Sequence, residues 1–189
     1  MSQNTITNPV IDLLQKRIAG RSITSEPLPS SLVNELVEAA RMTPSCFNNQ
    51  PWRFLFLQSE EARKKGYEVL GSGNKVWAGR APLLVIGYTQ RSNDCVINDG
   101  RAYHQYDLGM SVMSIILSAT FHGLTARPMA GFSPAKAKEL FGLAPEDEPL
   151  VMVAIGRPSD DESFLPDHYK GLNQKPRERK SATEIVKIM

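Results

Sequence analysis

The stretch Thr43-Pro-Ser-Cys-Phe-Asn-Asn-Gln-Pro-Trp-Arg-Phe54 lies between a predicted helix and a predicted strand. Five hydroxyl and amide side chains gather in it, and its prolines fix the path of the backbone. Loops carried on a rigid scaffold often hold binding residues. The same amides could instead satisfy backbone groups in a structured connection between helix and strand. The residues alone leave both interpretations open.

Hydrophobic spacing predicts the elements on either side of this stretch. Pro29, followed by two serines, starts a helix with apolar residues at helical intervals, and this helix ends before Pro44 because the residue preceding proline avoids the helical region. The apolar run 54–57 is typical of a strand. Farther out we predict a helix that starts near Val10 and ends near Gly20, a charged surface helix over 60–70 and a flexible turn over 71–75.

The second half of the chain alternates buried strands with helices. Residues 83–88 and 150–155 are apolar without polar alternation, as in strands that are covered on both faces. Ser133-Pro134 starts a short helix that ends at Gly142. Residues 107–122 form a helix that is apolar almost all round, so its own domain or a partner has to cover it on every side. The pattern predicts a single α+β domain, a central sheet flanked by helices.

Composition narrows the class of protein. With 189 residues, 41% hydrophobic and 22% charged, the chain suits one globular domain, and its net charge of +2 argues against a nucleic-acid partner. No apolar run is long enough to span a membrane, and Met1-Ser-Gln-Asn-Thr5 lacks the layout of a signal peptide. Cys46 and Cys95 cannot build a disulfide framework, which favours reduced thiols and a cytoplasmic location.

The residue types also exclude several kinds of site. His104, His122 and His168 are far apart in sequence and no Cys-x-x-Cys accompanies them, so we expect no metal. Gly71-Ser-Gly-Asn-Lys75 resembles a phosphate loop only superficially, because the lysine does not follow the second glycine directly.

Two pairs of arginines are candidates for binding a phosphate. Arg17 and Arg21 are four residues apart and share one side of the chain, whether it is helical or extended. Arg177 and Arg179 alternate as in an extended segment. Guanidinium groups match phosphate geometry and stay charged, so a phosphate monoester would suit them. Solvated surface charge is the alternative interpretation.

Several motifs occur together in a recognisable order, and through them the chain resembles the FMN-dependent nitroreductases. These flavin enzymes use NAD(P)H to reduce nitroaromatics and quinones. The motifs are Lys16-Arg-Ile-Ala-Gly-Arg21 ahead of Glu26-Pro27, the stretch 38–54, which is similar to the family's Ala-Pro-Ser-x-x-Asn-x-Gln-Pro-Trp-x-Phe, Ala81-Pro82, Asp107-Leu-Gly-Met110 and Met129-Ala-Gly-Phe132.

The resemblance implies a nitroreductase-like fold with a mixed or antiparallel sheet, in an intertwined homodimer with FMN at the subunit interface. It implies an enzyme, an NAD(P)H-dependent flavin oxidoreductase that reduces nitroaromatic or quinone-type small molecules by a ping-pong mechanism. The alternatives are another FMN-dependent specialisation, such as azoline oxidation or dehalogenation, and a non-catalytic flavin-binding protein. The residues choose neither the acceptor nor NADH over NADPH.

The resemblance also assigns the cofactor's contacts. Arg17 and Arg21 would hold the FMN phosphate together with Arg177 and Arg179, and the backbone N–H of Ala19 would replace a serine hydroxyl of the family. In the family these contacts are completed by the neighbouring subunit. Its contribution would come from Ser45, Cys46 and Asn48.

The remaining contacts are expected around the flavin ring. Asn74 would reach its pyrimidine edge, and Ala130 and Gly131 would lie beside it, with the backbone N–H of Gly131 near N5. No side chain is expected to act as a general acid or base, because the flavin carries the redox chemistry. Phe47 and His104 line the opening of the site, face solvent or pack against other residues; the sequence leaves these alternatives open.

Residues 158–189 form the last predicted segment. They contain few core-forming residues, so the segment cannot make its own core, yet they end in the apolar stretch Ile185-Val-x-Ile188. The resemblance implies that this arm packs on the partner subunit and completes its flavin site.

Overall fold

The computed structural model describes residues 8–189; the stretch Met1–Thr5, used above for the expectation about a signal peptide, lies outside them. Its core is a four-stranded sheet in the order β1-β2-β4-β3, with every neighbouring pair antiparallel. The predicted α+β class with a central sheet is confirmed. The strands are β1 (Trp52–Leu57), β2 (Leu83–Thr89), β3 (Thr125–Met129) and β4 (Glu148–Gly156).

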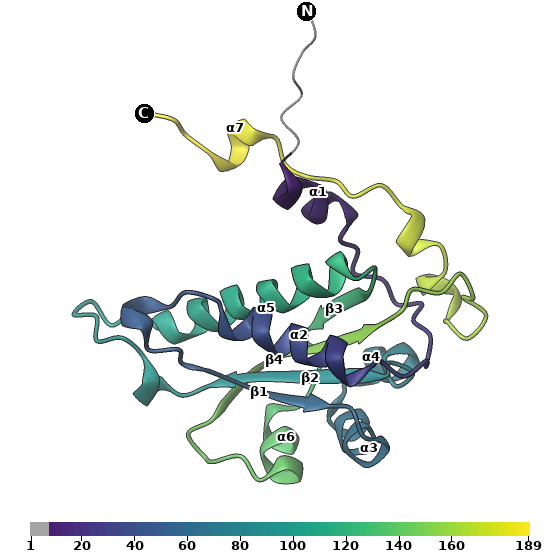
Figure 1. The fold of residues 1–189 in the computed structure, drawn as a ribbon, viewed down its shortest axis with the longest axis horizontal. Coiled ribbons are helices and arrows are strands. Elements are labelled where there is room, and N and C mark those ends of the chain that lie inside the picture. The colour runs from purple at the N-terminus through teal and green to yellow at the C-terminus, as the bar shows by residue number, and fades with distance from the viewer. Residues whose placement is uncertain (1–7) are drawn as a thin grey trace, which may run out of the picture.

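Helices cover both faces of the sheet (Figure 1). Leu83 and Val85 of β2 point into one apolar cluster, and Leu84 and Ile86 point into the other, as the two-residue period of a strand requires. The first cluster is covered by α2 (Ser30–Arg41) and α5 (Tyr103–Phe121), and the second by α3 (Glu60–Val69), α4 (Ser72–Ala78) and α6 (Pro134–Phe141).

Local signals place the helix ends close to their predicted positions. The Ser133 hydroxyl accepts the N–H of Lys136 at the start of α6, and Gly142 ends the helix at φ 63°, a left-handed conformation that favours glycine. The first helix, α1 (Pro9–Lys16), begins at Asn8, whose side chain accepts the N–H of Val10. It ends earlier than the predicted position near Gly20, because Arg17 leaves the helical region at ψ 121°.

The structure differs from the prediction at three elements. The flexible turn predicted over 71–75 is wrong, because these residues begin α4, which the buried indole of Trp77 fixes against the sheet. Strand β3 was not predicted, since Thr-Ala-Arg-Pro-Met shows no alternation; its proline is tolerated because β3 is an edge strand. Helix α5 also starts four residues before Asp107, where the Asp94 carboxylate accepts the N–H of Tyr103.

One face of α5 is not covered by its own domain. Leu108, Ile115 and Ala119 are fully buried under the sheet, whereas Tyr106 is 56% exposed and Phe121 73% exposed. The partly exposed Met110, Met113 and Leu117 complete a stripe at helical spacing between those two aromatic residues. The sequence of this helix is apolar almost all round, and this stripe is the part of its apolar surface that its own domain does not cover.

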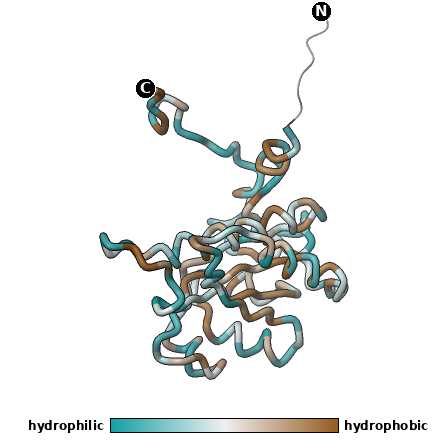
Figure 2. Tube along the Cα trace, turned by 60° about the vertical axis from the view of Figure 1, so that its left-hand side comes forward, coloured by the Kyte–Doolittle hydropathy of each residue, from teal (hydrophilic) through white to brown (hydrophobic). Residues whose placement is uncertain are grey.

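The C-terminal segment divides into two parts. Up to about residue 173 it contacts its own domain: Pro158 bridges to Ile23, and Leu165 is buried in the second apolar cluster. Residues 174–189 are all exposed, and Figure 2 shows their apolar end standing away from the body of the molecule. Packing of the segment 158–189 on a second copy stays a prediction, and residues 174–189 are its fully exposed part.

Membrane spans and metal clusters are both absent from the part of the chain that the structure describes. Within residues 8–189, no helix is both long and apolar enough to cross a bilayer. The same residues contain no cluster of three His, Cys, Asp or Glu side chains placed to hold a metal ion.

Candidate functional site

A hollow of about 290 Å³ gathers the predicted phosphate-binding arginines at one end of the sheet. Arg17, Ala19 and Arg21 come from the loop after α1, and Arg177 and Arg179 come from the C-terminal segment. Arg177 crosses the end of α1, where its guanidinium donates to the carbonyls of Leu14, Gln15 and Arg17. The structure thus brings together two groups of residues that are far apart in the sequence.

The charge of this hollow is not balanced by the residues that line it. Six cations lie around it, and none of the described lining residues is a carboxylate: Arg17, Arg21, Arg127, Lys175, Arg177 and Arg179. Burial lowers the pKa of Arg17, and the neighbouring cations Arg177 and Arg179 lower it further. The buried Nε of Arg21 has no hydrogen-bond partner among residues 8–189. A phosphate would supply the missing negative charge and acceptors.

Sequence reasoning missed two lining cations, Arg127 and Lys175, and also Tyr169, which contacts the lining residue Arg21. Arg127 of β3 donates to the carbonyl of Ala19, and burial followed by the charge of Arg21 lowers its pKa. Tyr169 stacks on the Arg21 guanidinium, 4.2 Å from the ring centroid, and its hydroxyl donates to the Gly73 carbonyl at 3.3 Å. Tyr169 therefore positions Arg21 and joins the hollow to α4.

Asn74 and Gly131 lie together beside the hollow. The Nδ2 of Asn74 donates to the Gly131 carbonyl at 3.0 Å, and the N–H of Gly71 donates to the same oxygen at 2.9 Å. A Cβ at position 131 would come within 2.9 Å of the Asn74 amide nitrogen. Ala130 and Gly131 are exposed, so their backbone can face a ligand.

The loop with Ser45, Cys46 and Asn48 is held in an unusual backbone conformation. Phe47, Asn48 and Gln50 have φ values of 49°, 57° and 48°, although none is glycine. Such conformations cost about 1–3 kcal/mol each and cluster at ligand sites. The Ser45 hydroxyl accepts the N–H of Gln50 at 2.9 Å, so it stabilises its own loop.

The buried Asp107 carboxylate fixes the start of this loop. It accepts the N–H of Cys46 at 3.1 Å, and its other oxygen has no partner among the described residues. Burial raises the pKa of the Asp107 carboxyl and the Asp94 carboxylate adds to this, while the bond from Cys46 opposes it. His104 is 1% exposed, so it packs in the interior, whereas Phe47 is exposed.

The two cysteines are joined, which corrects the expectation of reduced thiols. Cys46 forms a disulfide with Cys95, with 5.9 Å between their Cα atoms. Antiparallel pairing explains the meeting: Trp52 of β1 lies opposite Thr89 of β2, and each cysteine stands six residues beyond that pair. The Cys46 side chain is therefore committed to Cys95.

The loop 45–50 and the chain segments that line the basic hollow lie at opposite ends of α5 (Figure 1). Cys46 is bound at Asp107 near the start of the helix, whereas Gly20 of the hollow packs against Thr125 just beyond its end. Fourteen residues from Asp107 to Phe121 span about 21 Å of helix. One chain thus carries two separate groups of the predicted contacts.

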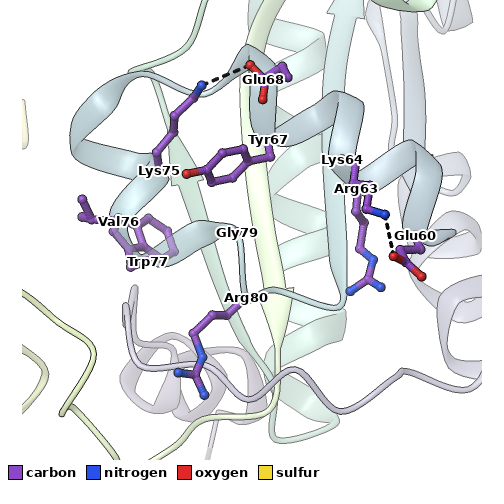
Figure 3. A pocket seen from close by; sticks show the side chains of 10 residues that line it. All are labelled: Glu60, Arg63, Lys64, Tyr67, Glu68, Lys75, Val76, Trp77, Gly79 and Arg80. Atoms are coloured by element: carbon purple, nitrogen blue, oxygen red, sulfur yellow. Dashed lines mark hydrogen bonds and ion pairs between the residues drawn. The ribbon is translucent and has the colours of Figure 1, made fainter.

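A different hollow, of about 470 Å³, lies between α3 and α4 (Figure 3). Its lysines are paired: Lys64 lies 2.7 Å from Glu60, and Lys75 lies 3.4 Å from Glu68. None of the predicted site residues lines it, and we assign it no role.

Fold and site together define a class of protein: an α+β domain with a cationic hollow at one end of its long helix and a strained polar loop at the other. The Nitroreductase family profile matches residues 14–76 and 70–157. The chain belongs to the nitroreductase family, and the predicted resemblance is confirmed.

Relatives and solved structures agree with this membership. A protein of Stenotrophomonas maltophilia strain K279a, named "Putative NADH dehydrogenase/NAD(P)H nitroreductase", is 31% identical over 153 residues, covering 71% of this chain and 78% of its own. An "NADH dehydrogenase" of Thermus thermophilus is 26% identical over 188 residues, covering 82% of this chain and 91% of its own.

The solved structures confirm the nitroreductase-like fold. A crystal structure of an FMN-containing oxidoreductase has a TM-score of 0.84 at 25% identity and covers 98% of this chain and 92% of its own. A crystal structure from Exiguobacterium sibiricum, described as "a putative nitroreductase in complex with FMN", has a TM-score of 0.76 at 19% identity over the full length of both chains.

Proposed function

We propose that this protein is an FMN-dependent oxidoreductase that transfers electrons from NAD(P)H to nitroaromatic or quinone-type acceptors by a ping-pong mechanism. The observation that carries the proposal is the hollow of six cations, in which the Nε of Arg21 has no hydrogen-bond partner among the described residues. The names of the relatives and the FMN in related structures support the same cofactor and donor. When bound, FMN would accept a hydride from NAD(P)H and pass the electrons on to the acceptor.

The chain's own residues would bind and orient the cofactor. Arg17, Arg21, Arg177 and Arg179 would hold the phosphate, with the Ala19 backbone completing its contacts. Asn74 would reach the pyrimidine edge of the ring. Its amide already donates to the Gly131 carbonyl, which supports a common position for Asn74, Ala130 and Gly131 beside the flavin.

A second copy of the chain would complete the site in a homodimer. Ser45, Cys46 and Asn48 lie at the far end of α5 from the hollow, so the loop of one chain would serve the flavin of the other. The exposed apolar stripe on α5 supports such an interface, because an apolar face of this length is usually buried. We propose the cytoplasm as the compartment.

The proposal is tested by the absorbance of the purified protein and by steady-state kinetics. We expect a yellow protein with a flavin spectrum, and NAD(P)H oxidation that depends on added quinone. Double-reciprocal plots at several quinone concentrations should be parallel, as for ping-pong kinetics. Bound flavin without turnover would favour the flavin-binding alternative, and failure to bind FMN would overturn the proposal.

Replacing Gly131 tests the position of the flavin ring. We expect Gly131→Val to slow flavin reduction by NAD(P)H at least about tenfold, because a branched side chain would occupy the space beside N5 and press on the Asn74 amide. Stopped-flow absorbance measures the reduction directly. Ala135→Val is the matched control, since Ala135 is an exposed residue in the first turn of α6, outside the Asn74–Gly131 pair. An unchanged reduction rate in the Gly131 variant with FMN bound would contradict the assignment.

A further inference from the structure

The Cys46–Cys95 disulfide joins two segments that have few other attachments. Cys46 begins the strained loop 45–50, and Cys95 belongs to the segment 91–102 between β2 and α5. Cys95 is 5% exposed and is the one buried residue in that segment, whereas the next residue, Val96, is 90% exposed. The disulfide is therefore the main interior anchor of the segment.

The loop depends on neighbours to keep its backbone conformation. Phe47, Asn48 and Gln50 keep positive φ angles only while the surroundings hold them there. Besides the disulfide, one bond to the loop comes from the Asp107 carboxylate of α5. Another runs from the Asn49 side-chain amide to the Asp94 carbonyl at 3.2 Å, and so it too depends on the position of the segment 91–102.

Asp94 links the segment 91–102 to the start of α5. Its carboxylate accepts the N–H of Cys95 at 2.8 Å and the N–H of Tyr103 at 2.9 Å. The disulfide, the Asp94 loop and the first turn of α5 thus form one connected unit around Cys46.

We propose that Cys46 and Cys95 are a reversible redox pair that fastens the loop 45–50 to the segment 91–102, and that reduction by a dithiol releases both. Its effect on flavin retention rests on the proposed function, in which this loop contacts the flavin of the second copy.

The chemistry is thiol–disulfide exchange. A thiolate of the dithiol attacks the sulfur of Cys46, which is the less buried of the two, and the S–S bond breaks with Cys95 leaving as a thiolate that takes up a proton. The second thiol of the reductant then attacks the mixed disulfide and releases Cys46. Two electrons and two protons pass to the protein, and the reductant leaves as its own disulfide.

The first test counts thiols and follows the two segments in the full-length protein. The protein as purified in air should have no reactive thiol, and millimolar dithiothreitol without denaturant should expose two. Hydrogen exchange should then quicken at least about tenfold in residues 45–50 and 91–102, while β2 and β4 stay unchanged. An oxidant such as glutathione disulfide should reverse both changes.

Variants separate the effect of breaking the disulfide from other effects of the reductant. Cys95→Ser should show the fast exchange without reductant and should not respond to dithiothreitol, and Ser92→Ala, in the same segment, should behave as the parent chain. Resistance of the disulfide to dithiothreitol, two free thiols after air oxidation, or equal exchange in both redox states would each overturn the proposal.

Flavin affinity is measured separately. Reduction should weaken FMN binding about three- to tenfold, because the loop no longer holds a fixed contact surface. If neither redox form binds FMN, the proposed function fails. Hydrogen exchange still decides in that case whether the disulfide fastens the loop 45–50 to the segment 91–102. If FMN binds equally to both forms although exchange differs, the coupling to the flavin is wrong.

Discussion

Deleting residues 175–189 is expected to abolish dimerisation and FMN retention together. The segment carries Ile185, Val186 and Ile188, which are exposed in the single chain, and apolar residues in this number need a partner surface. It also carries Arg177 and Arg179 of the basic hollow. An obligate interface of this kind is hydrophobic and buries more than about 2,000 Å² in total. Light scattering and the flavin-to-protein absorbance ratio measure the two losses.

Two further variants separate the roles of the segment. Replacing Ile185 and Ile188 with glutamate keeps the arginines and should make the protein monomeric. Replacing Arg177 and Arg179 with alanine keeps the apolar residues and should weaken FMN binding in a protein that stays dimeric. Cutting after Gln174 rather than after Pro158 spares Leu165, which belongs to the protein's own core. A shortened protein that remains yellow and dimeric would refute the assembly.

Much of the fold was predictable because its central elements carry strong local signals. β2 and β4 are continuous apolar runs, which is the pattern of strands buried on both faces. α2 and α6 have clear start and stop residues. The predicted arginines and the Asn74–Gly131 pair also meet in the structure, because the family's motifs already carry their spacing.

The elements that were missed depend on contacts that are distant in sequence. The sequence of α4 is typical of a turn because glycines lie at its start. Burial of Trp77 and a hydrogen bond from Gly71 to Gly131 nevertheless stabilise a helix there. Arg127 lies on a strand without alternation, so its place in the hollow follows only from the pairing of β3 with β4. The disulfide depends on the register of β1 and β2. This register cannot be inferred from the sequence until the two strands are known to pair.

Removing the phosphate-binding arginines should weaken FMN binding strongly. Arg21→Ala is expected to raise the Kd for FMN about 10- to 100-fold, because a charge-assisted hydrogen bond contributes about 1.5–3 kcal/mol and each tenfold corresponds to about 1.4 kcal/mol. The double variant Arg17→Ala/Arg21→Ala should lose at least about 100-fold. Quenching of flavin fluorescence measures both constants.

Two comparisons decide whether the loss comes from the phosphate. Riboflavin, which lacks the phosphate, should bind the parent chain and both variants with the same affinity. The Kd of Arg21→Lys for FMN should lie between those of the parent chain and Arg21→Ala. Lysine keeps the charge, but it cannot donate two parallel hydrogen bonds to a pair of phosphate oxygens or stack on the Tyr169 ring as a guanidinium does. Arg91→Ala serves as the matched control, since Arg91 is an exposed arginine between β2 and α5, outside the basic hollow. Equal FMN affinity in the parent chain and the Arg21 variants would show that the cations of this hollow do not hold the phosphate.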